Sequence, residues 1–237
     1  MGLAIARKLL LPGNHLLCIS RKTNDTLAAQ AKMAQVPLHQ WTHDLTRSAD
    51  VSARLEQWLR EQAPADFDSA VLINNAGMIP QIGPISEAGA DDIGQGLRVG
   101  LEAPMQLTAA FLRATGAWQA RRKVLNISSG LGRKAMASQG IYCAAKAGMD
   151  HFTRCLALEE ALKPNGAAVS SLAPGVVDTD MQVQLRSTDA SAFPDQKNFV
   201  NLKEQGQLAS PEEAATRVLA YLARADFGSH PVADVRD

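Results

Sequence analysis

The sequence predicts one α/β domain built on a doubly wound parallel sheet. Short apolar runs alternate with longer amphipathic runs along the chain, which indicates strands alternating with helices. This alternation favours a parallel sheet covered by helices on both faces, and right-handed crossovers then give a doubly wound sheet. The length of 237 residues suits a single large domain, and no repeat or linker divides residues 1–237.

The elements of the first part of the chain follow from local patterns. Residues 3–11 place apolar side chains on one helix face, and Pro12-Gly13-Asn14 ends that helix. The apolar run 15–20 predicts a buried strand, and 26–35 is helical in composition. A second short strand is expected at 37–42, and an amphipathic helix follows within 51–62.

The alternation continues through the second part. The run 69–74 is dense in branched residues, which favours a strand. One long helix is expected at 93–115 and another at 140–162, with strands at 123–128 and 167–172.

The last third of the chain contains the least regular stretch. A helix is expected at 211–225, whereas residues 180–210 are polar and poorly periodic. An insertion of this kind near strand ends is where a substrate lid is expected.

Composition excludes several classes of function. Lysine plus arginine equals the acidic residues, 24 against 24, which gives no indication of nucleic acid or an anionic membrane as a partner. No apolar run approaches the ~20 residues that span a bilayer. The three cysteines lack CxxC spacing, so neither a disulfide framework nor a metal site is expected, and we expect a reducing cytoplasm.

Three residues form the strongest chemical pattern. Tyr142 and Lys146 are four residues apart in a predicted helix and share a face, and Ser129 ends a strand thirteen residues before Tyr142. The pKa of a free tyrosine is ~10, and a nearby ammonium group lowers it. Tyr142 can then act as a general acid toward a carbonyl oxygen that Ser129 also holds. Taken alone, a Tyr-x-x-x-Lys pair is more often ordinary helix surface.

Further motifs surround this pattern in a fixed order. Asn74-Asn75-Ala76-Gly77 follows one strand, Ser129 precedes Tyr142-x-x-x-Lys146, and Pro174-Gly175-Val-Val-Asp-Thr179 follows another strand. In these motifs nearly the whole chain resembles the short-chain dehydrogenase/reductase family. The resemblance implies a Rossmann-type sheet, a nicotinamide cofactor, and hydride transfer to or from a carbonyl.

The resemblance also implies roles for individual residues. Tyr142 becomes the acid/base, Lys146 lowers its pKa and holds the nicotinamide ribose, and Ser129 positions the substrate oxygen. Asp44, with Leu45 beside it, matches the position that receives the adenine amine. The other residues implied at the cofactor are Gly2, Asn75, Ala76, Gly77, Pro174, Gly175, Val177 and Thr179.

The end of the strand at 15–20 indicates which cofactor is used. An acidic residue at this position repels the adenosine 2′-phosphate that NADPH has and NADH lacks. This chain instead has Ser20 and Arg21, which can donate hydrogen bonds to that phosphate. We therefore expect NADPH. The alternative is that Arg21 and Lys22 are solvated loop charges.

The chain departs from the family pattern in two places. Gly100 stands where the family commonly has an asparagine that supports proton resupply, and a water could fill the space beside a glycine. Of the glycine-rich phosphate loop only Gly2 remains, and the strand before it is absent. We expect the protein to begin about 12–16 residues earlier, enough for a strand and the loop.

The C-terminal part resembles the sepiapterin reductase branch, through residues 178–182, 202–208, 227–230 and 235–237. In that branch an acidic residue anchors the pterin, and Asp234 is its nearest counterpart; a strand-end aspartate facing water is the alternative. A small ketone, dicarbonyl or pterin side chain is expected as substrate. The residues expected around it are Ser129, Leu131, Tyr142, Met181 and Asp234.

Three interpretations of the whole chain stay open. The first is an NADPH-dependent carbonyl reductase, expected as a homodimer through the helices at 93–115 and 140–162. The second is a dinucleotide-binding protein without catalytic activity, which the missing asparagine would permit. The third is a truncated gene product. The joint presence of Ser129, Tyr142 and Lys146 favours the first interpretation over the second.

Overall fold

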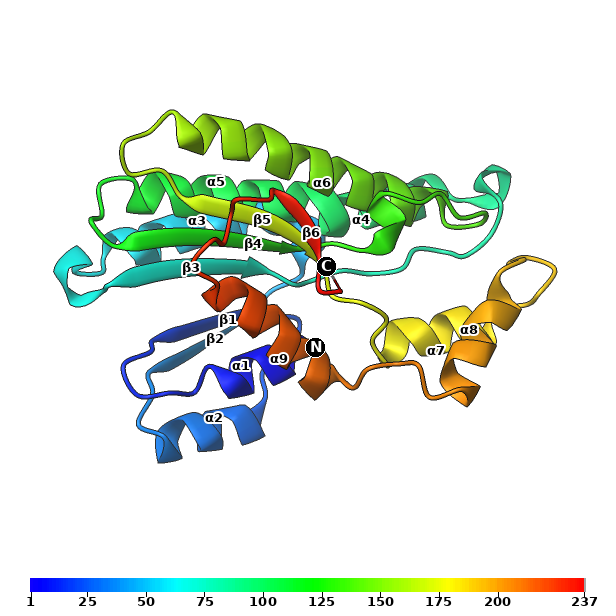
Figure 1. The fold of residues 1–237 in the computed structure, drawn as a ribbon, viewed down its shortest axis with the longest axis horizontal. Helices are drawn as coiled ribbons and strands as arrows, with labels where there is room; N and C mark the ends of the chain where they lie inside the picture. The colour runs from blue at the N-terminus through cyan, green and yellow to red at the C-terminus, as the bar shows by residue number, and fades with distance from the viewer. Residues whose placement is uncertain (237) are drawn as a thin grey trace.

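The structure is a computed structural model that describes residues 1–236, and it confirms the α/β class with a parallel sheet (Figure 1). Asp237, which ends the last C-terminal motif, lies outside the described residues. All pairings between the named strands are parallel. β1 (Leu16–Ser20) pairs with β2 (Leu38–Thr42). The other four strands pair in the order β3 (Ser69–Asn74), β4 (Arg121–Ile127), β5 (Ala168–Ala173) and β6 (Val232–Asp234).

Helices cover both faces of the sheet, as the doubly wound pattern predicts (Figure 1). One layer contains α3 (Ser48–Arg60), α4 (Ala90–Leu97), α5 (Ala103–Thr115) and α6 (Gly140–Ala161). The opposite layer contains α1 (Gly2–Lys8), α2 (Asp25–Met33) and α9 (Pro211–Ala223). A helical pair, α7 (Asp180–Ser187) and α8 (Gln196–Glu204), extends beyond the carboxyl ends of the strands.

Each helix layer has its own hydrophobic core against the sheet. Val124 and Leu125 are neighbours on β4 and point to opposite faces, and both are fully buried. Val124 packs with Leu55, Phe111 and other residues of the α3–α5 side. Leu125 packs with Val218 and other residues of the α1–α9 side. Burial on both faces explains why Val124 and Leu125, which are successive residues of β4, are both apolar instead of alternating with an exposed polar residue.

The sheet is interrupted between β1 and β3. Within residues 1–236, β1 pairs only with β2 and β3 only with β4. The edge position has a measurable consequence, because Val71 on β3 is 43% exposed while Val124 and Leu125 on β4 are 0% exposed. The interruption lies between the two strands that the sequence analysis expects to flank a further strand.

The long helix expected at 93–115 is broken in the middle. A π-helical turn at Arg98–Glu102 joins α4 to α5, and the N–H of Ala103 donates to the carbonyl of Arg98. Pro104 is the second residue of α5 and has no N–H to donate, which favours a local change in the hydrogen-bond ladder.

Two more differences concern the C-terminal third. Residues 180–210 contain α7 and α8, which the weak periodicity did not predict, and Phe193 and Phe199 bury their rings against each other there. The three-residue strand β6 is too short to produce an alternating pattern. Among the described residues, no helix has the length and apolar character needed to cross a bilayer.

Candidate active site

One large cleft collects the residues that the sequence predicts to be functional. It has a volume of about 1620 Å³, it opens at the carboxyl ends of β3, β4 and β5, and it continues into the interruption of the sheet. Ligands of open parallel sheets bind at this edge. The predicted residues that line it are Gly2, Ser20, Arg21, Asp44, Leu45, Asn75, Ala76, Gly77, Ser129, Leu131, Tyr142, Lys146, Pro174, Gly175, Val177, Thr179 and Met181.

Ser129 and Tyr142 meet at the end of β4. Ser129 begins a short turn, in which its hydroxyl accepts from the N–H of Leu131 at 3.2 Å. Tyr142 lies in the first turn of α6. Burial raises the pKa of Tyr142, and a hydrogen bond with the Ser129 side chain partly opposes that rise. Burial is the dominant influence, so the pKa of Tyr142 lies above its usual value, whereas the sequence analysis expected a lowered pKa.

Lys146 lies one helical turn after Tyr142, at the base of the cleft. Its side chain is buried, and its Nζ donates to the carbonyl of Ile127 at 2.7 Å. The Nζ atom is 5.8 Å from the centroid of the Tyr142 ring. Burial lowers the pKa of Lys146 to about 8, and the negative charge of Asp150 opposes that shift. The ammonium keeps further N–H donors beyond the one that Ile127 accepts.

Asp150 is a site residue that the sequence analysis missed. It is 1% exposed, and its Oδ1 accepts from the hydroxyls of Ser128 (2.5 Å) and Ser171 (2.6 Å). These bonds fasten α6 to the carboxyl-end halves of β4 and β5, beside Ser129. Gly132 passes so close that a Cβ there would lie 2.7 Å from the Asp150 Oδ2. The spacing of Lys146 and Asp150, four residues on one helix, was the available signal.

A second buried polar group holds the ends of β3 and β4 together. The Asn74 Nδ2 donates to the Asn126 Oδ1 at 2.8 Å and to Thr108 at 3.1 Å. The Asn126 Nδ2 donates in turn to Thr153 on α6 at 2.9 Å. This chain of amides fixes the position at which residues 75–77 leave the sheet, because buried amides need partners with defined geometry.

The far end of the cleft carries the residues expected at the adenosine. Gly2 touches Asn75 so closely that a Cβ at Gly2 would lie 2.6 Å from the Asn75 Nδ2. The Ser20 hydroxyl donates to the carbonyl of Lys22 at 2.7 Å, a bond it would exchange to donate to a phosphate. A backbone hydrogen bond from Thr46 lowers the pKa of Asp44, and the charge of Arg21 contributes to that shift.

The other end of the cleft has an apolar roof. Gly175 takes a left-handed conformation (φ 80°) that favours glycine and turns the chain from β5 toward α7. Asp178 then pairs with Lys203 of α8 at 2.6 Å and with Arg186 of α7 at 3.6 Å, which ties both helices to this turn. The roof cluster packs beside Tyr142 and consists of Ile79, Ile82, Met136, Met181, Leu185, Phe193, Phe199 and Leu202.

Asp234 does not fit the role expected of it. It is absent from the lining of the cleft, and Arg236 (2.6 Å) and Arg133 (3.4 Å) already bind its carboxylate. A pterin edge would have to compete with both guanidinium groups. We therefore leave Asp234 out of the proposed substrate site.

Gly100 also differs from its expected role. A Cβ there would lie 2.8 Å from the Cβ of Ala145, which directly precedes Lys146. The absence of a side chain at Gly100 therefore allows close contact between the π turn and α6 at Ala145.

A doubly wound parallel sheet with serine, tyrosine and lysine at a dinucleotide-sized cleft is typical of a Rossmann-type oxidoreductase. The family model described as short chain dehydrogenase matches residues 1–190. The chain belongs to this family and is an oxidoreductase of the short-chain dehydrogenase/reductase type.

Its relatives include carbonyl reductases. A benzil reductase ((S)-benzoin forming) from Bacillus cereus is 34% identical over 227 residues, covering 96% of this chain and 91% of the relative. A sepiapterin reductase from Xenopus tropicalis is 31% identical over 222 residues, covering 90% of this chain and 82% of the relative. The solved structure of a short-chain dehydrogenase from Sphingobium yanoikuyae in complex with NADPH matches with a TM-score of 0.73 at 26% identity. The match covers 98% of this chain and 82% of the other.

Proposed function

We propose that this protein is an NADPH-dependent reductase of small ketones or vicinal dicarbonyls with apolar substituents. The observation that carries the proposal is the meeting of Ser129, Tyr142 and Lys146 in one cleft whose far end is lined by Arg21. The first three residues can act on a carbonyl oxygen. The fourth can recognise a 2′-phosphate through its planar donor groups.

The cleft fits a dinucleotide. Its volume of about 1620 Å³ exceeds the ~300–1,000 Å³ of ordinary ligand pockets, although part of that space belongs to the interrupted sheet. Asn75, Ala76 and Gly77 line the part that would hold the adenosine. The residues that would hold the nicotinamide end are Pro174, Gly175, Val176, Val177 and Thr179. When bound, the reduced nicotinamide supplies the hydride that reaches the carbonyl carbon.

The chain's own residues handle the oxygen and its proton. Burial keeps the Tyr142 hydroxyl protonated at neutral pH, which is the form that an acid needs. Ser129 lies beside that hydroxyl and can donate to the same substrate oxygen. The Lys146 ammonium can donate its remaining protons to the ribose hydroxyls and so orient the nicotinamide.

The apolar roof supports a substrate with bulky uncharged groups. The roof cluster comes from the loop after β3, the turn before α6 and the segment from α7 to α8. It packs aliphatic, thioether and phenyl side chains against Tyr142. The relative from Bacillus cereus is named for benzil, a vicinal diketone with two phenyl groups. The ion pairs of Asp234 make a pterin the weaker of the two candidate substrates.

The proposal is tested by supplying the purified protein with benzil and either NADPH or NADH, and by identifying the product. We expect benzoin, formed with a kcat/KM for NADPH at least roughly tenfold above that for NADH, the scale of one charge-assisted contact. Tight NADPH binding without reduction of any ketone would instead support a non-catalytic dinucleotide-binding protein.

A further inference from the structure

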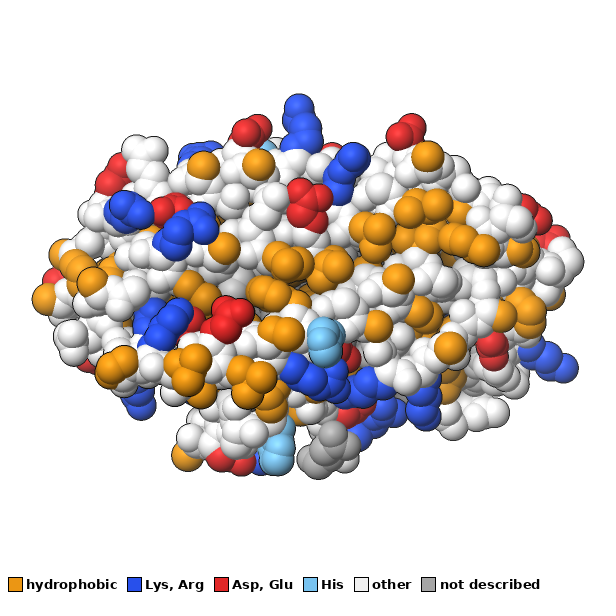
Figure 2. Space-filling view, turned by 90° about the horizontal axis from the view of Figure 1, so that it is seen from above, with side chains coloured by type: hydrophobic (Ala, Val, Ile, Leu, Met, Phe, Trp, Pro, Cys, Tyr) orange, Lys and Arg blue, Asp and Glu red, His pale blue; other side chains and the backbone are white. Residues whose placement is uncertain are grey.

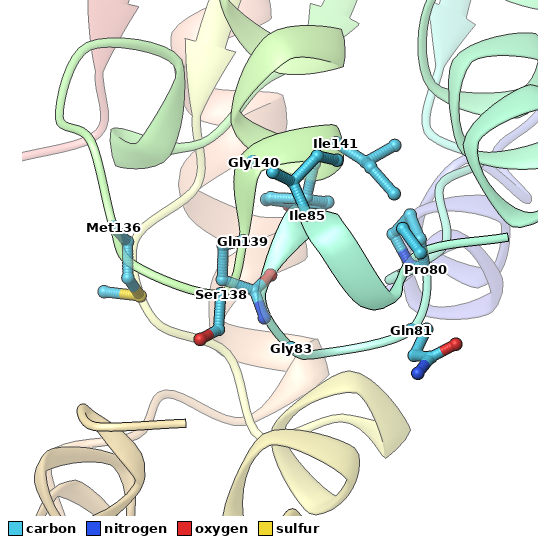
Figure 3. A pocket seen from close by; sticks show the side chains of 11 residues that line it. Pro80, Gln81, Gly83, Ile85, Met136, Ser138, Gln139, Gly140 and Ile141 are labelled. Carbon is cyan, nitrogen blue, oxygen red and sulfur yellow. The ribbon is translucent and has the colours of Figure 1, made fainter. Parts of the chain in front are cut away.

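A second, smaller cavity lies beside Tyr142 (Figure 3). It has a volume of about 220 Å³ and is formed between the loop after β3 and the turn that begins α6. The two segments are joined by a hydrogen bond from the N–H of Gly83 to the carbonyl of Ser138 at 3.2 Å. Most of its walls are apolar, with Pro80, Ile85 and Ile141 among them.

Gln139 brings an unpaired amide to this cavity. The residue is 3% exposed, and within residues 1–236 its Nε2 has no hydrogen-bond acceptor. Its main chain is fully used, since its N–H donates to Met136 and its carbonyl accepts from Cys143. Buried amides normally have hydrogen-bond partners, so this Nε2 is a donor that a bound molecule can use.

The backbone holds Gln139 in place. Ser138 directly before it adopts a left-handed conformation (φ 64°), which is uncommon for a residue other than glycine. Gln139 is the N-cap residue of α6, and Tyr142 follows three positions later on the same turn. In Figure 3 the Gln139 side chain extends from this turn toward the chain at Gly83.

Gln139 also borders the main cleft together with Ser129 and Tyr142. An amide donor is therefore available on the cavity side of the site where Tyr142 and Ser129 hold one carbonyl oxygen. A substrate with a second carbonyl on the adjacent carbon presents an acceptor close to the first. A monoketone of the same shape lacks it.

We propose that Gln139 is the residue that makes this site selective for vicinal dicarbonyls, by donating from its Nε2 to the carbonyl that is not reduced. The inference rests on the proposed function and deepens it. The reaction itself is unchanged: the cofactor gives a hydride to one carbonyl carbon, and Tyr142 gives a proton to its oxygen.

The test compares benzil with deoxybenzoin, which has the same skeleton and one carbonyl fewer. In Gln139→Leu we expect kcat/KM for benzil to fall by about 10–100-fold, the range for a lost hydrogen bond to a buried group, while deoxybenzoin changes less than about threefold. Gln139→Glu keeps the shape but loses the donor, so it should behave like Gln139→Leu. Gln119→Leu, an exposed glutamine before β4, is the matched control and should change neither substrate.

The outcomes separate this inference from the proposed function. A wild-type protein that reduces neither compound overturns both. A wild-type protein that reduces both, with a benzil-to-deoxybenzoin ratio that Gln139→Leu and Gln139→Glu leave unchanged, overturns only the role of Gln139. Equal losses for both substrates would show that Gln139 supports the turn rather than the second carbonyl. A selective loss for benzil supports the proposal.

Discussion

Lys146 and Asp150 lie one turn apart on α6, and the charge of Asp150 raises the pKa that burial lowers in Lys146. The pair therefore sets the pH range in which the ammonium exists at the base of the cleft. Asp150 at the same time holds Ser128 and Ser171, so one carboxylate joins the electrostatics of the site to its geometry.

This arrangement predicts a pH dependence with a defined sign. With a pKa of about 8, Lys146 loses its proton as the pH rises through 8, so kcat/KM for NADPH should fall above that value. Asp150→Asn removes the charge that favours the ammonium, so the falling limb should move to lower pH. Profiles of the wild type and Asp150→Asn check this, and an unmoved or upward-shifted limb would contradict it.

Arg21 carries the cofactor preference in this account. Removing its guanidinium should weaken NADPH binding by roughly 1.5–3 kcal/mol, about 10–100-fold, because a charge-assisted contact to the 2′-phosphate is lost. NADH lacks that phosphate and serves as the internal control. Titration of Arg21→Ala with both cofactors measures the difference, and equal losses would mean that Arg21 does not recognise the phosphate.

At the scale of elements, the contact between the π turn and α6 positions the catalytic helix. Gly100 faces Ala145, and Gly148 lies so near Leu101 that a Cβ would come within 2.9 Å of its side chain. Both contacts lie beside Lys146. The turn and the helix are therefore packed through positions that have no room for larger residues.

Adding a methyl group at Gly100 tests that packing. Overpacking costs about 1–3 kcal/mol, whereas replacing a mid-helix glycine by alanine gains about 0.5–1 kcal/mol, so Gly100→Ala should be destabilising. Asparagine is the residue that the family commonly has at this position. Gly100→Asn should nevertheless destabilise the fold more than Gly100→Ala, because its side chain is larger. Gly94→Ala meets only ordinary contacts on α4 and should be neutral or stabilising. Melting temperatures of the three variants and the wild type measure these differences. A Gly100→Ala protein that melts above the wild type would show that the π turn and α6 are not closely packed there.

The sequence could predict those parts of the site that depend on local spacing. Tyr142 and Lys146 are one turn apart, and residues after strand ends meet at one edge of any parallel sheet. The same spacing places Asp150 beside Lys146, but its contacts with Ser128 and Ser171 could not be predicted, because these partners approach it only in the folded chain. The π turn depends on Pro104 and on the contact with α6, and α7 and α8 depend on buried Phe193 and Phe199. None of these produces a periodic pattern.

At the scale of the whole molecule, α5 and α6 retain exposed apolar side chains. Leu158 and Leu162 are 73% and 87% exposed, and Met105 is 40% exposed. Figure 2 looks onto this side of the molecule and shows hydrophobic side chains gathered on it. Exposed apolar groups on neighbouring helices are typical of contact surfaces, so the homodimer through α5 and α6 stays our prediction.

The interrupted sheet leads to a prediction about stability. Unpaired strand edges inside a sheet leave backbone groups without partners, and β1 and β3 each present one such edge. A further parallel strand between β1 and β3 would pair with both edges. A chain extended at its N-terminus by such a strand should therefore melt at a higher temperature and bind NADPH more tightly than residues 1–237. Equal melting and equal affinity would contradict this.

If Tyr142 protonates the carbonyl that NADPH reduces, Tyr142→Phe removes the acid and leaves the cofactor contacts in place. The measurement is kcat for benzil reduction together with the dissociation constant of NADPH, for the wild type and the variant. We expect a loss of about 10²–10⁴-fold in kcat, the contribution of a positioned acid, with an almost unchanged dissociation constant. A Tyr142→Phe protein that keeps kcat within a few-fold of the wild type would contradict it.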